Sequence, residues 1–444
     1  MAASEPSAHA TGRRLEPASP GAKVTRLELF YDLVFVYAFL NVTTVTGEQI
    51  SPAELLKSLL VLALLWFGWS SFALLGNAVR TDEGFGPLLG FATMAAVFLL
   101  VVSIPEAFGD ERAYDVPVAL VLPGCYLLVR TLEVLALWYA GRHDPQVPGR
   151  WWRPVVPIVV ATALLALAAL LPPRLADGES MFLVRVGLWL AAIGVEYGAG
   201  LLIRTDGLTL VSVGHWAERH ALILLIAFGE SVISLGVGPG LQFRLPLTWT
   251  VLGASVLGIA VIAALWWAYF DVPAIAAEQV LHRLRGAARL ALARDAYTYL
   301  HLPMIAGVIL LAFGLKRVLA VIAEDSVGGL DITHRRLLYG GIALYLLALL
   351  AFQLRTLRVL DRVQPIPITL LVVLGFVPWR PPAFLDLAAL VVLMAGMLIL
   401  QAVRSRHGRQ RLRRLKLEEQ RALEAEETEL RRRNLGRWIP PVAG

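Results

Sequence analysis

Long apolar segments alternate with short polar ones along most of the chain. A helix needs about 20 apolar residues to cross the hydrocarbon core of a bilayer. Twelve segments approach that length, and their expected bounds are 27–46, 54–75, 86–107, 115–140, 154–171, 181–203, 216–236, 247–270, 295–314, 336–355, 364–378 and 384–403. The pattern therefore predicts an all-α fold, a polytopic bundle of about twelve transmembrane helices. The segment 364–378 is the shortest, and a re-entrant helix is the alternative there.

The composition agrees with a membrane protein and excludes several kinds of site. Hydrophobic residues make up 57% of the chain and charged residues 17%, whereas soluble domains contain about 25% charged residues. Cys125 is the only cysteine, so an intramolecular disulfide and cysteine-rich metal or redox sites are excluded. We expect no cofactor, and we attribute the basic balance to membrane orientation and not to nucleic-acid binding.

The basic residues between the apolar segments predict the orientation. Lys and Arg favour the cytoplasmic side of a membrane protein, and a cytoplasmic N-terminus places most of them there. The segment 316–336 is the exception, because it puts Lys316, Arg317, Arg335 and Arg336 outside. We predict a multi-pass protein of the plasma (inner) membrane with both termini in the cytoplasm.

The two ends of the chain differ in character from the bundle at 25–403. Residues 1–24 are polar, and we expect a disordered cytoplasmic tail. Residues 404–444 alternate basic and acidic blocks, which predicts a charged cytoplasmic helix or tail. That tail is interpreted either as an electrostatic anchor to anionic lipid or as a surface for a partner.

Two carboxylates lie in the first apolar segment. A charged side chain at mid-bilayer costs at least about 2.5–3.5 kcal/mol, so such residues are usually paired or functional. Glu28 and Asp32 are four residues apart, which puts both on one face of a helix. Asp32 is interpreted as a proton or cation site or as a carboxylate paired with an arginine, and Glu28 is nearer the membrane surface.

Glu230 is the strongest candidate for a functional residue. It lies about 18 Å along the helix axis beyond Glu218 and Arg219, which begin the same apolar segment. His215 and Glu218 have metal-ligand chemistry, but His215 and His220 point to different sides of a helix and the spacing differs from that of zinc proteases. We therefore expect no metal.

Two further groups of ionisable residues lie within apolar segments. Arg130 is interpreted as the counter-charge for Asp32, Glu196 or Glu230, since a guanidinium can make paired hydrogen bonds to a carboxylate. In the segment that begins near Asp295, His301 lies about 9 Å farther along the axis. It is interpreted as a proton relay or as a neutral packing residue.

Four motifs give the chain a resemblance to a known family. They are Glu28–Val36, Glu218-Arg219-His220 followed by Gly229-Glu230-Ser231, Trp267–Asp271 and Arg294–His301. The sequence resembles the bacterial low temperature requirement protein A family. The resemblance implies a multi-pass bacterial membrane protein, and it carries over no biochemical activity.

The two acidic motifs also resemble each other. The segment 30–35 can be aligned with 228–233, which places Asp32 on Glu230. Each motif lies in the first apolar segment of a six-segment half, as in transporters built from parallel repeats. Chance similarity between apolar helices is the alternative.

The leading functional hypothesis is a proton- or cation-coupled transporter or ion-conducting protein. Asp32 and Glu230 would be its titrating carboxylates, Arg130 their counter-charge and His301 a relay. The partners expected are the lipid bilayer and a proton, a cation or a small molecule. The rival hypotheses are a membrane-embedded enzyme acting on lipid-linked substrates, with Ser231 beside Glu230, and a structural or assembly factor.

Overall fold

A computed structural model describes residues 18–19, 21–45, 51–108, 116–141, 153–171, 178–202, 210–237, 248–325 and 327–434. The described part of the chain is helical, and this confirms the predicted all-α class. The disorder expected at 1–24 falls mostly outside these residues. At the other end, the charged tail forms a helix as far as Asn434.

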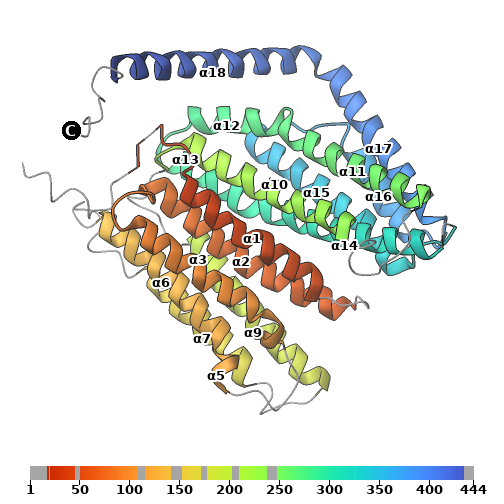
Figure 1. Cartoon of the computed structure of the whole chain (residues 1–444), viewed down its shortest axis with the longest axis horizontal. Helices are drawn as coiled ribbons and strands as arrows, with labels where there is room; N and C mark the ends of the chain where they lie inside the picture. The colour runs from red at the N-terminus through yellow and green to blue at the C-terminus, as the bar shows by residue number, and fades with distance from the viewer. Residues whose placement is uncertain are drawn as a thin grey trace, which may run out of the picture.

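The described residues of the first half form six longer helices and two short ones. They are α1 (Arg26–Val45), α2 (Pro52–Ala78), α3 (Gly86–Val102), α4 (Ile104–Ala107), α5 (Val116–Ala119), α6 (Val121–Gly141), α7 (Val155–Leu170) and α9 (Gly178–Leu202). These helices, red to yellow in Figure 1, form one lobe of the molecule.

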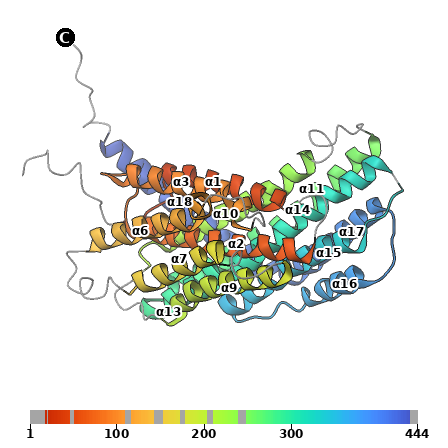
Figure 2. The same ribbon diagram turned by 90° about the horizontal axis from the view of Figure 1, so that it is seen from below.

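The second half forms the other lobe, green to blue in Figure 1. Its elements are α10 (Val213–Val237), α11 (Trp249–Phe270), α12 (Pro273–Arg283), α13 (Gly286–Leu292), the π-helix η3 (Ala293–Tyr299), α14 (Leu300–Glu324), α15 (Ile332–Leu357), α16 (Pro365–Phe376), α17 (Ala383–Arg404) and α18 (Arg406–Asn434). The last helix, α18, lies across the end of the bundle where α12 is found (Figure 1). Figure 2 shows the same arrangement from below.

Every predicted apolar segment coincides with a helix. Within the described residues, eight helical stretches are long and apolar enough to cross a membrane, and α3, α7 and α16 are shorter apolar helices. The α1 helix has 20 residues and carries Glu28 and Asp32. With 12 residues, α16 spans about 18 Å, less than the hydrocarbon core of about 30 Å. The chain is thus a membrane protein, and the number of twelve crossings stays a prediction.

Several helix ends are set by side chains that satisfy free backbone groups. The hydroxyl groups of Ser51 and Thr248 accept N–H bonds at the first turns of α2 and α11. Asp331 accepts two such bonds at the start of α15. These residues are preferred N-caps because the first turn of a helix has unpaired N–H groups. At the other end of α15, Arg358 adopts a left-handed conformation with φ of 55°, which stops the helix and turns the chain.

Small residues bring α14 and α15 into backbone contact. These two helices form the most extensive pair in the described part of the chain. A Cβ atom on Gly341 would lie 2.7 Å from the carbonyl oxygen of Gly307, and one on Gly307 would lie 2.6 Å from that of Gly341. Close helix packing through small residues is common inside membranes. The reciprocal glycines therefore set the distance between the two helices.

Substitution of Gly341 by alanine is expected to destabilise the protein by about 1–3 kcal/mol, because the added methyl group forces two backbones apart. Gly340 is the matched control, since a Cβ atom there meets nothing within 4 Å. Its replacement by alanine should stabilise the helix by about 0.5–1 kcal/mol. Equilibrium unfolding in detergent micelles measures both changes. Equal effects of the two substitutions would contradict the close contact.

Candidate functional site

The α1 and α10 helices lie side by side and run in the same direction (Figure 1). Three side-chain pairs join them, and in each the partners are 187 residues apart in the sequence. Arg219 also donates to the backbone carbonyl of Glu28 at 3.0 Å. Steps of four and eleven residues return to nearly the same helix face, because eleven residues make about three turns. We call these contacts the polar ladder: Glu28 with His215, Asp32 with Arg219, and Thr43 with Glu230. Because the two helices run in the same direction, an odd number of membrane crossings must lie between them.

The first contact of the polar ladder joins Glu28 to His215. Asn77 fixes the histidine: its amide oxygen accepts the backbone N–H of Val211, so its Nδ2 donates to the carbonyl of Ser212 and lies 3.3 Å from Nδ1 of His215. The ring nitrogen Nδ1 is then an acceptor, and Nε2–H donates to Glu28 at 2.9 Å. This contact is a hydrogen-bonded tie between helices that is buried at both side chains.

The second contact is a buried ion pair between Asp32 and Arg219. The guanidinium Nη1 of Arg219 lies 2.7 Å from the Asp32 carboxylate, and Nε1 of Trp69 donates to the same carboxylate at 2.9 Å. The side chains are 2% and 0% exposed, so each charge is neutralised inside the protein. Arg130 was expected as the counter-charge of Asp32, and that expectation is wrong. The neighbouring residue Glu218 is exposed.

The third contact places Glu230 against hydroxyl groups. Its Oε1 atom accepts hydrogen bonds from Thr43 at 2.7 Å and from Ser234 at 3.2 Å. Its Oε2 atom has no hydrogen-bond partner among the described residues, although Glu230 is fully buried. Lys316 on α14 acts on it electrostatically, but the two groups form no ion pair within the described part of the chain. Glu230 is therefore a buried carboxylate without a contacting cation there.

Asp32 and Glu230 do not share one site. Arg219, the partner of Asp32, precedes Glu230 by eleven residues on α10, which is about 16 Å along the helix axis. Each carboxylate has its own hydrogen-bond partners. The aligned acidic motifs therefore do not stand at the same level of the bundle.

Arg130 lies in a cluster within the first half. Its Nη1 atom is 2.6 Å from Glu133 on the same helix, and Nη2 is 3.5 Å from Glu196 on α9. Tyr126 donates a short hydrogen bond to Glu196. The expected pairing of Arg130 with Glu196 is confirmed, whereas the pairing with Glu230 is wrong. The cluster joins α6 to α9.

His301 lies in an aromatic cluster with a second histidine. Its Nδ1 atom donates to the carbonyl of Ala296, so Nε2 accepts the hydroxyl of Tyr269 at 2.9 Å. The ring centroid of His220 is 5.3 Å away. Rings from several helices complete this cluster: Trp66, Trp69, Trp216, Tyr297 and Phe352. Both nitrogens of His301 are thus used in hydrogen bonds that suit a neutral ring.

Asp295 is held at the edge of the bundle by two arginines. Its carboxylate is 2.7 Å from Arg294 beside it and 2.8 Å from Arg355 on α15. All three side chains are partly exposed. This arrangement joins the π-helix to α15 and does not reach the polar ladder through any of these contacts.

The residues considered for an enzyme do not form a catalytic pair. The hydroxyl of Ser231 donates to the carbonyl of Val308 on α14 and not to Glu230. His215 bonds to Glu28 and Asn77, while Glu218 is exposed. Among the residues that the structure describes, no group of three His, Cys, Asp or Glu side chains is arranged to hold a metal ion.

A further buried ion pair, between α15 and α17, was not predicted from the sequence. Arg335 on α15 lies 3.3 Å from Asp386 on α17, and Tyr339 donates to the same carboxylate at 2.6 Å. Arg335 also donates to the carbonyl groups of Val377 and Trp379. The available signal was Asp386 itself, a single carboxylate near the start of an otherwise uncharged apolar segment.

Comparisons with known proteins place the chain among bacterial membrane proteins. A family model described as bacterial low temperature requirement A protein (LtrA) matches residues 23–399. The chain is also similar to a protein of Rhizobium meliloti (strain 1021), whose printed name is "Uncharacterized protein RA0937". The two are 27% identical over 298 residues, which cover 65% of this chain and 67% of the relative. The family match includes all six residues of the polar ladder.

Proposed function

The chain belongs to the bacterial low temperature requirement A protein (LtrA) family, and we propose that it transports or conducts protons or cations across a membrane. In this proposal Glu230 is the group that takes up and releases the ion. The protein lies in the inner membrane with both termini in the cytoplasm, as the distribution of basic residues favours.

One observation carries this proposal: Glu230 is fully buried in a membrane-spanning helix and is hydrogen-bonded through Oε1 to hydroxyl groups alone. A buried ionised carboxylate is costly unless it is paired, and uptake of a proton or cation removes that cost. Oxygen atoms are also the ligands that hard cations prefer. Glu230, Thr43 and Ser234 together offer three such oxygen donors at one point between the two lobes.

The other contacts of the polar ladder have a positioning role in this proposal. The Asp32–Arg219 pair and the Glu28–His215 hydrogen bond hold α1 against α10. They thereby fix the register that brings Thr43 opposite Glu230. Asp32 therefore has a structural role in this proposal and does not exchange the ion.

A flux measurement with purified protein in liposomes tests the proposal. An imposed pH gradient, with the dye pyranine inside, reports proton movement, and a Na⁺ gradient with a sodium dye reports cation movement. Wild-type protein is expected to carry at least one of these fluxes. Glu230→Gln should reduce that flux to the level of protein-free liposomes, because an amide cannot exchange a proton or balance a cation.

Two further variants distinguish loss of function from loss of folding. Glu230→Asp keeps the acid and should retain part of the flux, while Glu179→Gln changes an exposed carboxylate on α9 and should retain all of it. Gel filtration establishes that each variant is folded. The proposal fails if wild-type protein carries neither flux, or if Glu230→Gln carries the same flux as wild type.

A further inference from the structure

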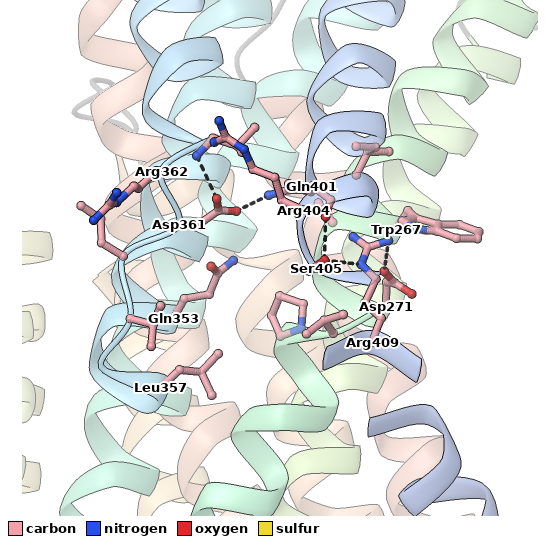
Figure 3. Close-up of a pocket in the computed structure, with 17 residues that line it drawn as sticks. Trp267, Asp271, Gln353, Leu357, Asp361, Arg362, Gln401, Arg404, Ser405 and Arg409 are labelled. Atoms are coloured by element: carbon pink, nitrogen blue, oxygen red, sulfur yellow. Dashed lines mark hydrogen bonds and ion pairs between the residues drawn. The ribbon is translucent and has the colours of Figure 1, made fainter. Parts of the chain in front are cut away.

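A cavity of about 540 Å³ opens where α11, α15, α17 and α18 meet (Figure 3). Its lining combines apolar and charged side chains. Trp267, Leu357, Leu360 and Leu398 contribute apolar surface, and Arg362, Arg404 and Arg409 contribute positive charge. The cavity lies at the end of the bundle that α18 crosses, away from the Glu230 carboxylate. It is therefore independent of the proposed ion site.

The acidic residues of this cavity already have partners. Asp271 forms ion pairs with Arg409, at 2.8 Å, and with Arg413. Asp361 accepts from the amide of Gln401 at 2.5 Å and from the backbone N–H of Val363 at 2.9 Å. Asp271 is thus paired with arginines, whereas Asp361, within the described part of the chain, accepts from neutral donors only and keeps its negative charge at the cavity wall.

Arg362 and Arg404 line the cavity without a carboxylate partner. Among the described residues, their guanidinium groups form no ion pair and no hydrogen bond, and both side chains are exposed to solvent. Three arginines and two carboxylates line the cavity, so its lining carries a net charge of +1, and Arg362 and Arg404 are its arginines without an ion-pair partner among the described residues. Arginine favours phosphate as a partner, because its planar fork matches two phosphate oxygens.

A buried amide adds a second polar group to the cavity. Gln353 on α15 is 7% exposed, and its side chain makes no hydrogen bond within the described part of the chain. Its amide end lies in the space between α15 and α17 (Figure 3). Buried amides are normally hydrogen-bonded, so an unpaired one that lines a cavity points to a ligand. The amide N–H groups of Gln353 suit an anionic oxygen.

The rim of the cavity is apolar and open to the surroundings. After the left-handed turn at Arg358, the chain exposes Val359 and Leu360, which are 63% and 51% exposed. Trp267 on α11 is 44% exposed. Tryptophan and exposed aliphatic residues at the end of a membrane bundle are typical of the interfacial region, where lipid headgroups lie.

From these observations we propose that the cavity binds a phosphate group, held by Arg404 and Arg362 and by the amide of Gln353. The headgroup of an anionic phospholipid would supply the phosphate together with chains for the apolar rim, and free phosphate would supply the charge alone.

Binding measurements on the purified full-length protein in detergent test this proposal. Three probes are compared by calorimetry: dioctanoyl phosphatidylglycerol, dioctanoylglycerol, which lacks the phosphate, and inorganic phosphate. We expect saturable binding of a phosphate-bearing probe and none of dioctanoylglycerol. Arg404→Gln should weaken that binding about tenfold, the order expected for the loss of one charge-assisted hydrogen bond.

Two more variants complete the test. Arg406→Gln makes the same change at an exposed arginine that does not line the cavity, and it should bind as wild type does. Gln353→Leu should weaken binding, because it removes the amide that reaches the cavity.

The pattern of binding assigns the source of the phosphate. Binding of phosphatidylglycerol but not inorganic phosphate assigns the site to a lipid headgroup, and binding of inorganic phosphate with equal affinity assigns it to free phosphate. Dioctanoylglycerol binding as tightly as phosphatidylglycerol would overturn the proposal. Unchanged phosphatidylglycerol and phosphate binding in Arg404→Gln would overturn it as well.

Discussion

Asp32→Asn is expected to lower the free energy of unfolding by about 3–5 kcal/mol, because it leaves the charge of Arg219 buried without a partner. The pair is almost completely inaccessible, with exposures of 2% for Asp32 and 0% for Arg219. Asparagine has nearly the shape of aspartate, so the loss reports the charge and not a cavity. Equilibrium unfolding of the purified protein in mixed micelles, with increasing SDS, measures the change.

A double variant tests the cause of this loss. Asp32→Asn combined with Arg219→Met removes both charges, and a buried ion pair replaced by apolar side chains often costs little. We expect the double variant to be more stable than Asp32→Asn alone. Equal or lower stability of the double variant would show that Arg219 is not the partner on which Asp32 depends.

Arg335→Met should lower the free energy of unfolding by a similar amount, about 3–5 kcal/mol, because it breaks the buried ion pair between α15 and α17. The substitution leaves the carboxylate of Asp386 buried with Tyr339 as its remaining hydrogen-bond donor. It also removes the donors to the carbonyl groups of Val377 and Trp379, which lie between α16 and α17. The same unfolding measurement applies.

The neighbouring arginine is the matched control for this prediction. Arg336 is exposed, and its guanidinium lies 4.8 Å from the ring centroid of Phe376. A cation–π contact at an exposed site contributes about 0.5–1 kcal/mol, so Arg336→Met should cost no more than that. Losses of equal size in the two variants would mean that burial of the Arg335–Asp386 pair does not decide the stability.

The hydrophobic pattern predicted the helices well, because a bilayer crossing imposes length and composition on each segment separately. All twelve predicted segments contain a helix. The same reasoning placed Glu28 and Asp32 on one face, and both do face α10. The length of a helix and the face on which a residue lies depend on one helix at a time, so both can be predicted from a single sequence.

The pairing of charges between helices was harder to predict. Asp32 and Glu230 match in the aligned motifs, yet the structure places Asp32 beside Arg219. The partner of a buried charge depends on how two helices slide past each other, and that register is set by packing along their whole length. Of the carboxylates predicted as partners of Arg130, Asp32 and Glu230 were therefore wrong and Glu196 was right.

The structure also explains part of the exception in the distribution of basic residues. Arg335 was counted among the charges of an outer loop, but it is buried and paired with Asp386. A neutralised arginine inside the protein does not act as a free loop charge. Arg335 and Asp386 lie in different apolar segments, and the sequence alone does not show that the two side chains meet.

The central claim is that Glu230 exchanges the ion while Asp32 and Arg219 only hold the two lobes in register. Proton and sodium flux through liposomes containing the Asp32→Asn/Arg219→Met double variant tests it most directly, beside Glu230→Gln in the same preparation. The account predicts that the folded double variant keeps a measurable part of the flux, because the Glu28–His215 hydrogen bond still holds α1 against α10, and that Glu230→Gln has none. Loss of flux in the folded double variant, with flux preserved in Glu230→Gln, would contradict it.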